Sequence, residues 1–527
     1  MLRRVGDRAL LVELPGLREV LSVQAQLQEY PVEGQVDVVA AARTVLITVE
    51  DARHVDGLAT RLRSIDPSVP AEQDDTLVTI EVEYCGADLA DVAARTGLSA
   101  DSVVSAHTAT PWVAAFGGFA PGFAYLTGGN PRLEVPRRDS PRMTVPAGSV
   151  ALAGTFSAVY PRESPGGWQL IGRTHAVLWD THRAEPALIK PGNRVQFVAV
   201  RELVEVRAPT TTIAGAVPAR ADRSATSDDG TAPRVSGAVS PGLIVVEPGL
   251  YGTVQDLGRP GLMALGVAQA GALDRSATRQ ANRLVGNRMG AAVIESLNGG
   301  LVLAALEDQV LAVTGAAVDL TIAMPDGRER EPALCAPFLL RDGEVLRQSA
   351  PASGLRAYTA VRGGFAVAEV LGSRSTDSMS GLGPPALTGG TRLVVGRPAQ
   401  GSTVAGPEVP RRPAVPEVLR VVPGPRDDWF DDDSLDHLCG TDWTVTAQSN
   451  RIGLRLDGPP VARKHEGELP SEGTVRGALQ IPPSGLPVLF LADHPVTGGY
   501  PVIAVVVSAD LDRAAQLPPG SVVRFRT

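Results

Sequence analysis

The chain has 527 residues, 44% of them hydrophobic and 20% charged, a composition typical of a soluble globular protein too long for a single core. Its formal net charge of −9 disfavours nucleic acids and anionic membranes as partners, because both repel an acidic surface. Cys85, Cys335 and Cys439 are far apart and no CxxC or HExxH motif occurs, so we expect reduced thiols, no metal site and a cytoplasmic protein. No stretch resembles a signal peptide or a membrane span.

The first 208 residues divide into two predicted units. Residues 1–80 mix the strand patterns "ALLVEL" and "TVLITVE" with helical patterns, which predicts a small α+β unit. Residues 81–208 begin with a strand and a helical pair that turns at Gly97. Short strands separated by proline and glycine follow, which predicts a β barrel or sandwich.

Residues 209–240 lack periodic apolar positions and are rich in Ala, Ser, Thr, Asp and Pro, which predicts a flexible linker between two halves. Residues 241–400 are predicted to form a β domain with one helix, in "ALDRSATRQANRLVGN". Leu273, Ala277, Ala281 and Leu284 fall on one face of that helix, and Gly286 follows as a C-terminal cap. A second proline-rich break precedes a last β domain at 415–527.

The two halves share an internal echo. "PGGWQLIG" at 165–172 is similar to "TGGYPVIA" at 497–504, and each precedes a closing strand, "PGNRVQF" or "PGSVVRF". Upstream, "AGSVALAG" and "EGTVRGAL" also align loosely. The shared order predicts that both halves end in similar β barrels, against the alternative of chance similarity between glycine-rich strands.

An uncharged aromatic loop, "FAPGFAYLTGG", lies beside several arginines. Phe119, Phe123 and Tyr125 alternate, so they share one face of an extended segment and can line either a core or a ligand pocket. Arg137, Arg142 and Arg173 follow; guanidinium groups bind carboxylates and phosphates, so a pocket for a small planar anion is one prediction. Solvated or ion-paired surface arginines are the alternative.

Other candidates are polar residues in apolar, glycine-punctuated segments. We assign catalytic roles to His107, Asp274, Glu472 and Asp493. Substrate-binding roles fall to Gln255, Arg259, Asn282, Gln448, Arg451, Gln480 and Tyr500. Ordinary turn-capping and structural hydrogen bonding is the alternative for each of these residues.

Several catalytic motifs are missing. GxxxxGK[ST] and GxGxxG do not occur, so neither a P-loop nor a dinucleotide fingerprint is expected. No GxSxG nucleophile elbow occurs, and the absence of Met-Lys-Met predicts that the chain carries no covalent biotin.

Long motifs resemble two known families. "GGFAPGFAYLTGGNPRLEVPRRDSPRMTVPAGSVALAG" with "YPRESPGGWQLIGRT" is similar to the KipI family, also called the B subunit of 5-oxoprolinase or allophanate hydrolase subunit 1. "PGLYGTVQDLGRPG", "LGSRST" (which contains Arg374), "QSNRIGLRL" and "SEGTVRGALQIPPSGLPVLFLAD" resemble KipA, or the C subunit of 5-oxoprolinase. The chain looks like a fusion of the two, and the resemblance implies a mainly β protein with tandem cyclophilin-like barrels.

The resemblance also implies a function. It is the ATP-dependent opening of 5-oxo-L-proline to L-glutamate, with Mg²⁺ accompanying the nucleotide and with the separate, LamB/YcsF-type A subunit of 5-oxoprolinase as partner. Ala270, in "AGALD" where the family usually has "SGAMD", and Val502 after "GGYP" depart from the family pattern and leave the exact substrate open. A biotin-dependent carboxyltransferase of urea or allophanate metabolism and a KipI/KipA-type regulator of a histidine kinase are the alternatives, and homo-oligomer formation also stays open.

Overall fold

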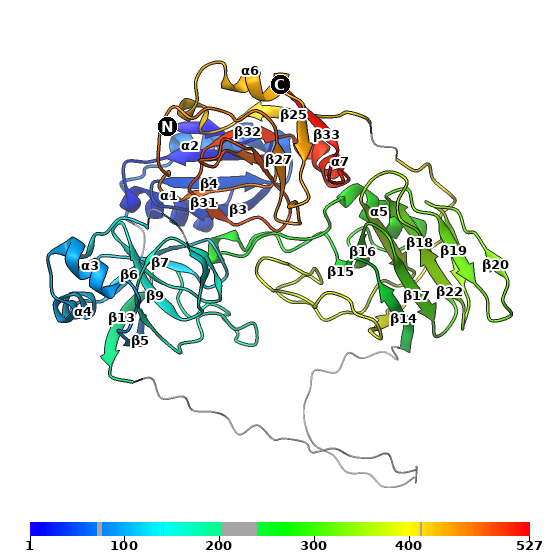
Figure 1. Cartoon of the computed structure of the whole chain (residues 1–527), viewed down its shortest axis with the longest axis horizontal. Helices are drawn as coiled ribbons and strands as arrows, with labels where there is room; N and C mark the ends of the chain where they lie inside the picture. The colour runs from blue at the N-terminus through cyan, green and yellow to red at the C-terminus, as the bar shows by residue number, and fades with distance from the viewer. Residues whose placement is uncertain (71–75, 139, 141, 203–239, 412–413) are drawn as a thin grey trace, which may run out of the picture.

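The computed structural model describes residues 1–70, 76–138, 140, 142–202, 240–411 and 414–527. The predicted linker at 209–240 lies outside the described residues except for its last position. In Figure 1 an upper lobe holds both chain termini, and two further lobes lie below it. The upper lobe combines the N-terminal unit with the C-terminal barrel, while the first barrel lies at the lower left and the middle domain at the lower right.

The N-terminal unit is a four-stranded antiparallel sheet with two helices on one face. Its elements are β1 (Leu2–Arg4), β2 (Ala9–Glu13), α1 (Leu17–Glu29), β3 (Gln35–Ala40), β4 (Thr44–Val49), η1 (Ala52–His54) and α2 (Val55–Ser64), with strand order β1-β2-β4-β3. Val20, Val23 and Leu27 recur at helical spacing on α1 and are buried, so α1 packs an apolar stripe on the sheet. The predicted α+β unit is confirmed.

The first barrel follows directly. Its elements are β5 (Leu77–Glu83), α3 (Leu89–Thr96), α4 (Ala100–Thr108), β6 (Trp112–Gly117), β7 (Ala124–Thr127), η2 (Pro131–Leu133), β8 (Arg142–Val145), β9 (Ser149–Ala153), β10 (Phe156–Val159), β11 (Ser164–Gly166), β12 (Gln169–Arg173) and β13 (Arg194–Val200). Gly97 ends α3 with a φ of +66°, a left-handed cap that glycine adopts without strain.

The middle domain packs two antiparallel sheets around one apolar core. Its elements are β14 (Ser240–Pro248), β15 (Tyr251–Gln255), η3 (Met263–Leu265), α5 (Arg275–Leu284), β16 (Val293–Leu297), β17 (Leu301–Ala305), β18 (Gln309–Gly315), β19 (Leu320–Ala323), β20 (Glu329–Arg330), β21 (Pro337–Leu340), β22 (Val345–Gln348), β23 (Arg356–Val361) and β24 (Arg392–Val395). The sheets have the orders β20-β19-β22-β17-β14-β24 and β15-β16-β23-β18-β21. Leucines and valines of both sheets share the core.

The second barrel closes the chain. Its elements are β25 (Glu417–Pro423), η4 (Asp427–Trp429), α6 (Ser434–Gly440), β26 (Trp443–Val445), β27 (Gly453–Asp457), β28 (Glu472–Gly473), β29 (Ala478–Gln480), β30 (Val488–Phe490), β31 (Thr497–Gly498), β32 (Val502–Val506), η5 (Ser508–Asp510), α7 (Leu511–Ala514) and β33 (Val522–Arg526).

The two barrels have the same topology. The closed orders are β5-β12-β9-β10-β7-β6-β13 and β25-β32-β29-β30-β27-β26-β33. In each barrel the first and last strands pair in parallel, and a separate two-stranded sheet, β8/β11 or β28/β31, stands apart from the barrel. The tandem barrels expected from the internal echo are therefore confirmed.

One part of the echo aligns differently from expectation. The amide of Gly148 donates to the carbonyl of Tyr160, and the amide of Gly477 donates in the same way to Phe490. Gly148 thus corresponds to Gly477, not to Gly473 as the loose motif alignment implied. The two sequences are only weakly similar there, because β9 and β29 share the alternation of side chains between two faces but not the residue types.

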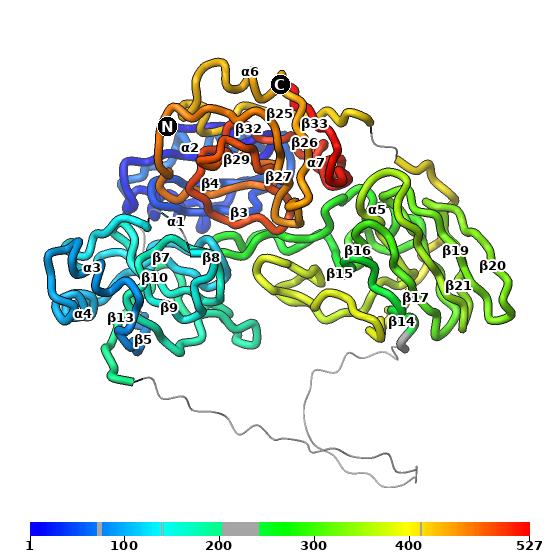
Figure 2. Tube along the Cα trace, in the orientation of Figure 1, coloured from blue at the N-terminus to red at the C-terminus, as the bar shows by residue number. Residues whose placement is uncertain are grey.

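The N-terminal unit lies between the two barrels. One side of its sheet shares a core with the aromatic side chains Phe116, Phe123 and Trp168 of the first barrel. The other side, through Leu11 and Leu46, packs on apolar residues of the second barrel. Figures 1 and 2 show this blue sheet against the orange and red strands of the second barrel. The two halves of the sequence are therefore interleaved in space.

No described helix has the length and apolar character to cross a membrane. Within the described residues, no three His, Cys, Asp or Glu side chains are grouped so that they could hold a metal ion.

Candidate functional site

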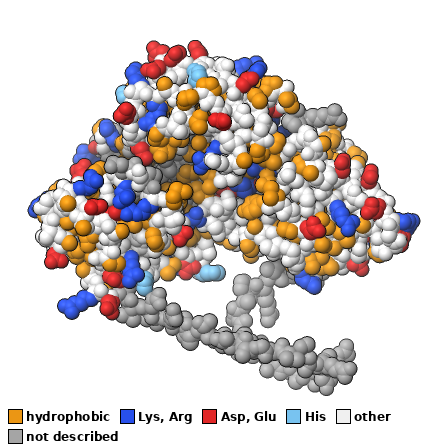
Figure 3. Space-filling model, in the orientation of Figure 1, with side chains coloured by type: hydrophobic (Ala, Val, Ile, Leu, Met, Phe, Trp, Pro, Cys, Tyr) orange, Lys and Arg blue, Asp and Glu red, His pale blue; other side chains and the backbone are white. Residues whose placement is uncertain are grey.

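The larger of two neighbouring cavities lies between the halves of the chain. This interlobe cavity, of about 620 Å³, is bounded by residues 5–9, 36–37 and 48–50 of the N-terminal unit, by residues 260–279, and by the second barrel. Figure 3 shows a hollow where the upper lobe meets the two lower ones, with apolar and basic side chains around it. The interlobe cavity needs the N-terminal unit and the second half together.

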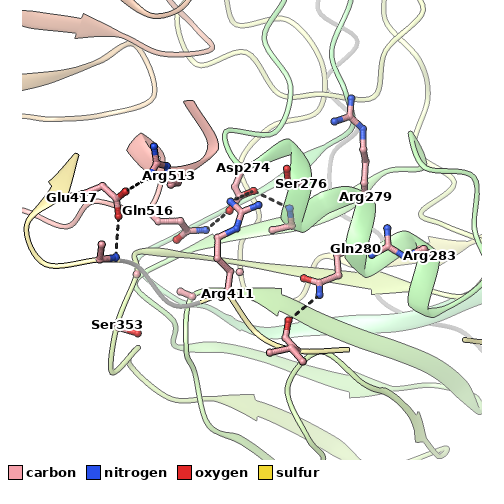
Figure 4. A pocket seen from close by; sticks show the side chains of 16 residues that line it. Asp274, Ser276, Arg279, Gln280, Arg283, Ser353, Arg411, Glu417, Arg513 and Gln516 are labelled. Carbon is pink, nitrogen blue, oxygen red and sulfur yellow. Dashed lines mark hydrogen bonds and ion pairs between the residues drawn. The ribbon is translucent and has the colours of Figure 1, made fainter. Parts of the chain in front are cut away.

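The second cavity lies on the other side of the start of α5. This α5 cavity, of about 490 Å³, is lined by α5, by Gly315, Ser353 and their neighbours in the middle domain, by the end of α7, and by Val409, Arg411, Ala414 and Glu417. Figure 4 shows Gln516 and Arg411 directed toward Asp274, and Arg279 pointing away from them. Ser276 and Arg279 line both cavities, so the first turn of α5 is their common wall.

The turn that enters α5 is fixed by side chains from both neighbouring domains. Arg451 Nη2 donates to the carbonyl of Gly271 at 2.7 Å, and Arg476 donates to the carbonyl of Leu273. The amide of Leu273 donates to Glu295 Oε2 at 2.9 Å. Backbone groups that would otherwise be orphaned at a helix start are therefore paired.

Two carboxylates complete this arrangement. Asp512 of α7 accepts from the amides of Arg275 and Ser276, both at 3.0 Å, and also from the Ser276 hydroxyl. Asp274 is the N-cap and accepts from the amide of Ala277 at 2.8 Å. The helix N-terminus is thus already neutralised by protein carboxylates, and α5 is a rigid wall between the cavities.

A buried network supports the same turn. Arg451 donates to both carboxylate oxygens of Asp493, at 2.9 and 3.0 Å, and also to Glu295. Tyr358 donates to Glu295 Oε2 at 2.9 Å and accepts from the amide of Asp274 at 2.8 Å. The structure therefore links three predicted residues, Asp274, Arg451 and Asp493, through Glu295 and Tyr358, behind the wall rather than within one cavity.

Two arginines of the interlobe cavity have guanidinium nitrogens without a hydrogen-bond partner in the described part of the chain. Nε and Nη2 of Arg275 and Nε of Arg476 are buried, and no described residue accepts a hydrogen bond from them. Burial, and then the charge of Arg476, lower the pKa of Arg275 to about 9, and burial also lowers the pKa of Arg476. Arg8 and Arg279 line the same cavity. Crowded cations with unused donors favour an anionic ligand.

The acidic residues around the cavity do not meet this demand. Asp512 is occupied by α5, and Asp7 accepts from the amide and the hydroxyl of Ser508, at 3.1 and 2.8 Å. Asp37 accepts from the amide of Met263 at 3.0 Å. Together with Glu50, these carboxylates balance the formal charge of the four lining arginines, but none of them accepts a hydrogen bond from the guanidinium group of Arg275 or Arg476.

Two further groups of the cavity are poised for proton chemistry. Burial raises the pKa of Asp37, so this carboxyl holds a proton more readily than an exposed one. Burial lowers the pKa of His494 to about 4, so the imidazole is neutral at pH 7. Its Nδ1 lies 2.8 Å from the carbonyl of Pro495 and must donate there, which leaves Nε2 as an acceptor.

In the α5 cavity, the carboxyl group of Asp274 has a raised pKa. It is 2% exposed, and burial followed by repulsion from Asp512 raises its pKa to about 6. Gln516 Nε2 donates to its Oδ2 at 3.0 Å, and Arg411 lies 3.9 Å from its Oδ1. Among the predicted site residues, Asp274 alone lines the interlobe cavity or the α5 cavity in the described part of the chain.

The structure places the aromatic loop at a domain interface. Phe123 and Tyr125 are buried and pack edge-to-face at 5.1 Å, with Phe119 beside them. Phe119 has a φ of +62°, and its amide donates to Thr497 Oγ1 of the second barrel at 2.9 Å. The loop therefore joins the first barrel, the N-terminal unit and the second barrel, as the alternative of a packed core expects.

The predicted arginines next to this loop all have acidic partners. Arg142 Nη2 donates to Asp88 Oδ1 at 2.7 Å, and Arg173 pairs with Glu83 at 2.8 Å. Arg137 joins Glu468 at 2.6 Å across the barrels. A pocket that requires these arginines would have to compete with ion pairs already formed.

His107 lies in the core of the first barrel. It is fully buried, stacks on Phe197 at 4.4 Å, and hydrogen-bonds Tyr84 and Ser157 at 2.6 and 2.8 Å. Burial lowers its pKa to about 3, so it is neutral. It lines neither cavity.

The other predicted residues are dispersed. Their surroundings, in chain order, are as follows: Gln255 bonds Thr253 and Thr376, Arg259 bonds the Ser375 carbonyl, Asn282 bonds the Ala291 carbonyl, Arg374 pairs with Glu369, Gln448 is exposed, Glu472 pairs with Arg426, Gln480 bonds the Tyr500 carbonyl, and Tyr500 is half-buried. They are not brought together in one pocket.

The sequence interpretation missed the arginines of the interlobe cavity. Arg275 directly follows the helix-capping Asp274, and Arg476 lies in the glycine-flanked segment "SEGTVRGAL". The positions of Arg275 beside a helix cap and of Arg476 between glycines were the only signals in the sequence for this site. Nothing local shows that residues 200 positions apart share a cavity.

The chain was compared with known proteins. Models of the carboxyltransferase domain match subdomains C and D over residues 1–189 and subdomains A and B over residues 265–527. The C subunit of 5-oxoprolinase from Escherichia coli (strain K12) is 36% identical over 288 residues, which cover 54% of this chain and 90% of the relative. The B subunit of 5-oxoprolinase from Escherichia coli O157:H7 is 43% identical over 162 residues, 30% of this chain and 74% of the relative. The crystal structure of TTHA0988 covers 100% of both chains, with a TM-score of 0.82 and 33% identity.

Proposed function

Because the chain belongs to the families of the B and C subunits of 5-oxoprolinase, joined in one polypeptide, we propose that it is the B/C component of an ATP-dependent 5-oxoprolinase. Relatives that are named as subunits imply partner subunits for this chain as well. The partner that we propose is the separate A subunit of the enzyme. The reaction is the opening of the lactam ring of 5-oxo-L-proline to L-glutamate.

One observation carries the proposal at the level of the site. The interlobe cavity combines the N-terminal unit of the B-like half with Arg275, Arg279 and Arg476 of the C-like half. A small carboxylic acid needs a guanidinium partner when it leaves water, and Arg275 and Arg476 have buried donors without a partner among the described residues. A site built by both halves explains why the two kinds of polypeptide occur together in one chain.

The chemistry fits such a cavity. The lactam amide is a poor electrophile; transfer of the γ-phosphoryl group to its carbonyl oxygen forms an O–P bond as the β–γ bond breaks and ADP leaves. Water then adds to the ring carbon, and the C–N bond opens with protonation of the nitrogen to give an acyl phosphate. A second water hydrolyses this acyl phosphate, which releases phosphate and leaves the new carboxylate. Guanidinium groups around the cavity stabilise the negative charge that develops in such steps.

The carboxyltransferase alternative is supported by the description of the domain models that match both halves. It requires biotin on a carrier supplied in trans and no ATP at this chain. The two functions therefore differ in the co-substrate that the cavity accepts.

The test is reconstitution. Purified full-length chain is mixed with the A subunit, 5-oxoproline, ATP and Mg²⁺, and glutamate and phosphate release are followed. We expect both products in equal amounts, little turnover with either component alone, and no dependence on a biotinylated carrier. Turnover that needs the carrier and not ATP would establish the carboxyltransferase instead.

A further inference from the structure

Arg275 and Arg476 bring three buried guanidinium nitrogens to the interlobe cavity that no described residue pairs. We propose that a nucleoside triphosphate binds across the first turn of α5, with its phosphates on Arg275, Arg279 and Arg476 in the interlobe cavity and its nucleoside in the α5 cavity. This assignment rests on the proposed function, which requires a nucleotide without saying where it binds.

Unused hydrogen-bond donors support the phosphate arm. Arg451, a buried arginine outside the cavity, is paired with the carboxylate of Asp493 at 2.9 Å. The guanidinium groups of Arg275 and Arg476 have no carboxylate hydrogen-bond partner among the described residues, and the nearby Asp512 accepts from backbone amides. A triphosphate, with many acceptor oxygens, can accept from several guanidinium groups at once.

The type of hydrogen-bond donor available at the start of α5 also supports a phosphate site. The amides at the start of α5 are occupied by Asp274 and Asp512, so the helix end itself offers a phosphate nothing. Side-chain guanidinium groups remain, and their planar forks bind phosphate oxygens in pairs. This explains how a triphosphate can bind to a chain that has no P-loop.

The adjoining α5 cavity supports the nucleoside arm. At about 490 Å³ the α5 cavity is within the ordinary size range of small-ligand sites, and Gly315 and Gly354 keep part of its wall free of side chains. Arg279 and Ser276 are shared with the interlobe cavity, so the two cavities adjoin at this turn. Arg411, on the rim, is a further cation there.

The experiment measures equilibrium binding to the full-length chain without the A subunit. The probes are inorganic triphosphate, which tests the phosphate arm alone, and a non-hydrolysable ATP analogue, which tests both arms, each with and without Mg²⁺. We expect both to bind, and the analogue to bind more tightly because it also fills the α5 cavity.

Variants separate the arms. Arg275→Gln and Arg476→Gln should each weaken both probes about ten- to a hundredfold, since each removes a charged hydrogen-bond donor. Arg279→Gln, at an exposed helical position, tests the same arm with little risk to folding. Ser353→Trp fills the α5 cavity and should weaken the analogue while leaving triphosphate unchanged. Arg18→Gln, on an 85% exposed side chain of α1, is the matched control and should change neither.

Each result decides the assignment. Unaltered binding in the three arginine variants overturns the phosphate site, and an analogue that binds no better than triphosphate, or is insensitive to Ser353→Trp, overturns the nucleoside site. Glutamate formation with the A subunit present, together with unaltered nucleotide binding in these variants, refutes this inference and leaves the proposed function standing. Triphosphate binding at the arginines without any 5-oxoproline turnover refutes the function and not the site.

Discussion

Asp88 and Arg142 in the first barrel correspond to Arg426 and Glu472 in the second, with the charges exchanged. The amide of Asp88 donates to the carbonyl of Leu170 on β12, and the amide of Arg426 donates to the equivalent Val502 on β32. The side chain of Asp88 then forms an ion pair with Arg142, the first residue of β8. In the same way, Arg426 pairs with Glu472, the first residue of β28. Because this ion pair lies at the same place in both barrels with its charges exchanged, we assign it a structural role.

This equivalence gives the first prediction. Arg142→Ala should lower the thermal stability and the activity together, by about 1–3 kcal/mol in the free energy of unfolding, because Asp88 is buried and keeps only Arg138 as a cationic partner. The exchange Asp88→Arg with Arg142→Glu copies the polarity of the second barrel and should recover part of the loss. Thermal melting and 5-oxoproline turnover in the presence of the A subunit are the measurements.

Arg173→Ala is the control, because the exposed pair with Glu83 should contribute less than about 1 kcal/mol. Loss of substrate binding in Arg142→Ala at unchanged melting temperature would instead support the anion pocket predicted from the sequence. The pH dependence follows the same pair: burial would raise the pKa of Asp88, but hydrogen bonds from Arg142 and the Leu170 amide outweigh it and hold this pKa below its usual value. The contribution of Asp88 to stability is thus lost only in strong acid.

Asp274 gives a prediction of opposite sign. Because burial raises its pKa to about 6, above the ordinary value of 3.8, its charged form is less favourable in the folded protein. Its contribution to stability is fully present below the unfolded pKa and is lost as the pH rises through about 6. Asp274→Asn has no such titration, so the stability of the wild type relative to this variant should fall between about pH 4 and 6.5.

Melting temperatures across this range test the prediction. Asp326→Asn is the control: hydrogen bonds from the side chain and the amide of Arg328 lower the pKa of this exposed carboxyl, so it does not titrate within the range. A wild-type curve parallel to that of Asp274→Asn would show that Asp274 is already charged at low pH.

At the scale of elements, the first turn of α5 depends on one residue from another domain. Asp512→Ala removes the acceptor for the amides of Arg275 and Ser276, and should cost about 1–2 kcal/mol, as the loss of a capping interaction does. Arg275 also loses the support of this turn, and we expect that loss to outweigh the two amides that become free for phosphate, so triphosphate binding should weaken as well. Asp512→Asn keeps one acceptor oxygen and should lose less in both measurements.

Asp101→Ala is the matched control, since Asp101 lies exposed in the first turn of α4, which Ser99 caps. It should change the free energy of unfolding by a few tenths of a kcal/mol at most and leave binding intact. Weaker triphosphate binding in Asp101→Ala as well would show that the loss in Asp512→Ala is not specific to α5.

The elements themselves could be predicted from the sequence far better than the site. α5 was predicted from its buried face and the glycine after its end, and the structure has Gly286 there with a φ of +74°; that Asp274 is the N-cap was not predicted. The matching barrels were indicated by short motifs because each motif closes the same part of the barrel. The pairing of Arg142 with Asp88, 54 positions away, has no local signature, so an ion-paired arginine and a ligand-binding one look alike in sequence.

At the scale of the whole molecule, the order of the units in the chain does not predict their order in space. The N-terminal unit is continuous in sequence with the first barrel, yet it also packs on the second barrel through Leu11, Leu46 and Val505. Asp37 and Asp7 bond to Met263 and Ser508, more than 200 positions away. The interlobe cavity is a consequence of this interleaving, so no local pattern could have predicted it.

The interleaving predicts that the halves reassemble without the segment that joins them. Residues 1–208 and 240–527, produced as separate chains, should co-elute as a one-to-one complex, because the second half alone would expose Ala478, Phe490 and Val505 to water. The relatives of the two halves are themselves separate subunits. Asp7→Ala combined with Asp37→Ala removes two acceptors that the first half supplies and should weaken the complex about tenfold or more. Size-exclusion chromatography with light scattering measures the association, and inorganic triphosphate binding to the reconstituted pair should match that of the intact chain. Halves that elute independently would mean that the joining segment, rather than the packing of the N-terminal unit on the second barrel, holds the cavity together.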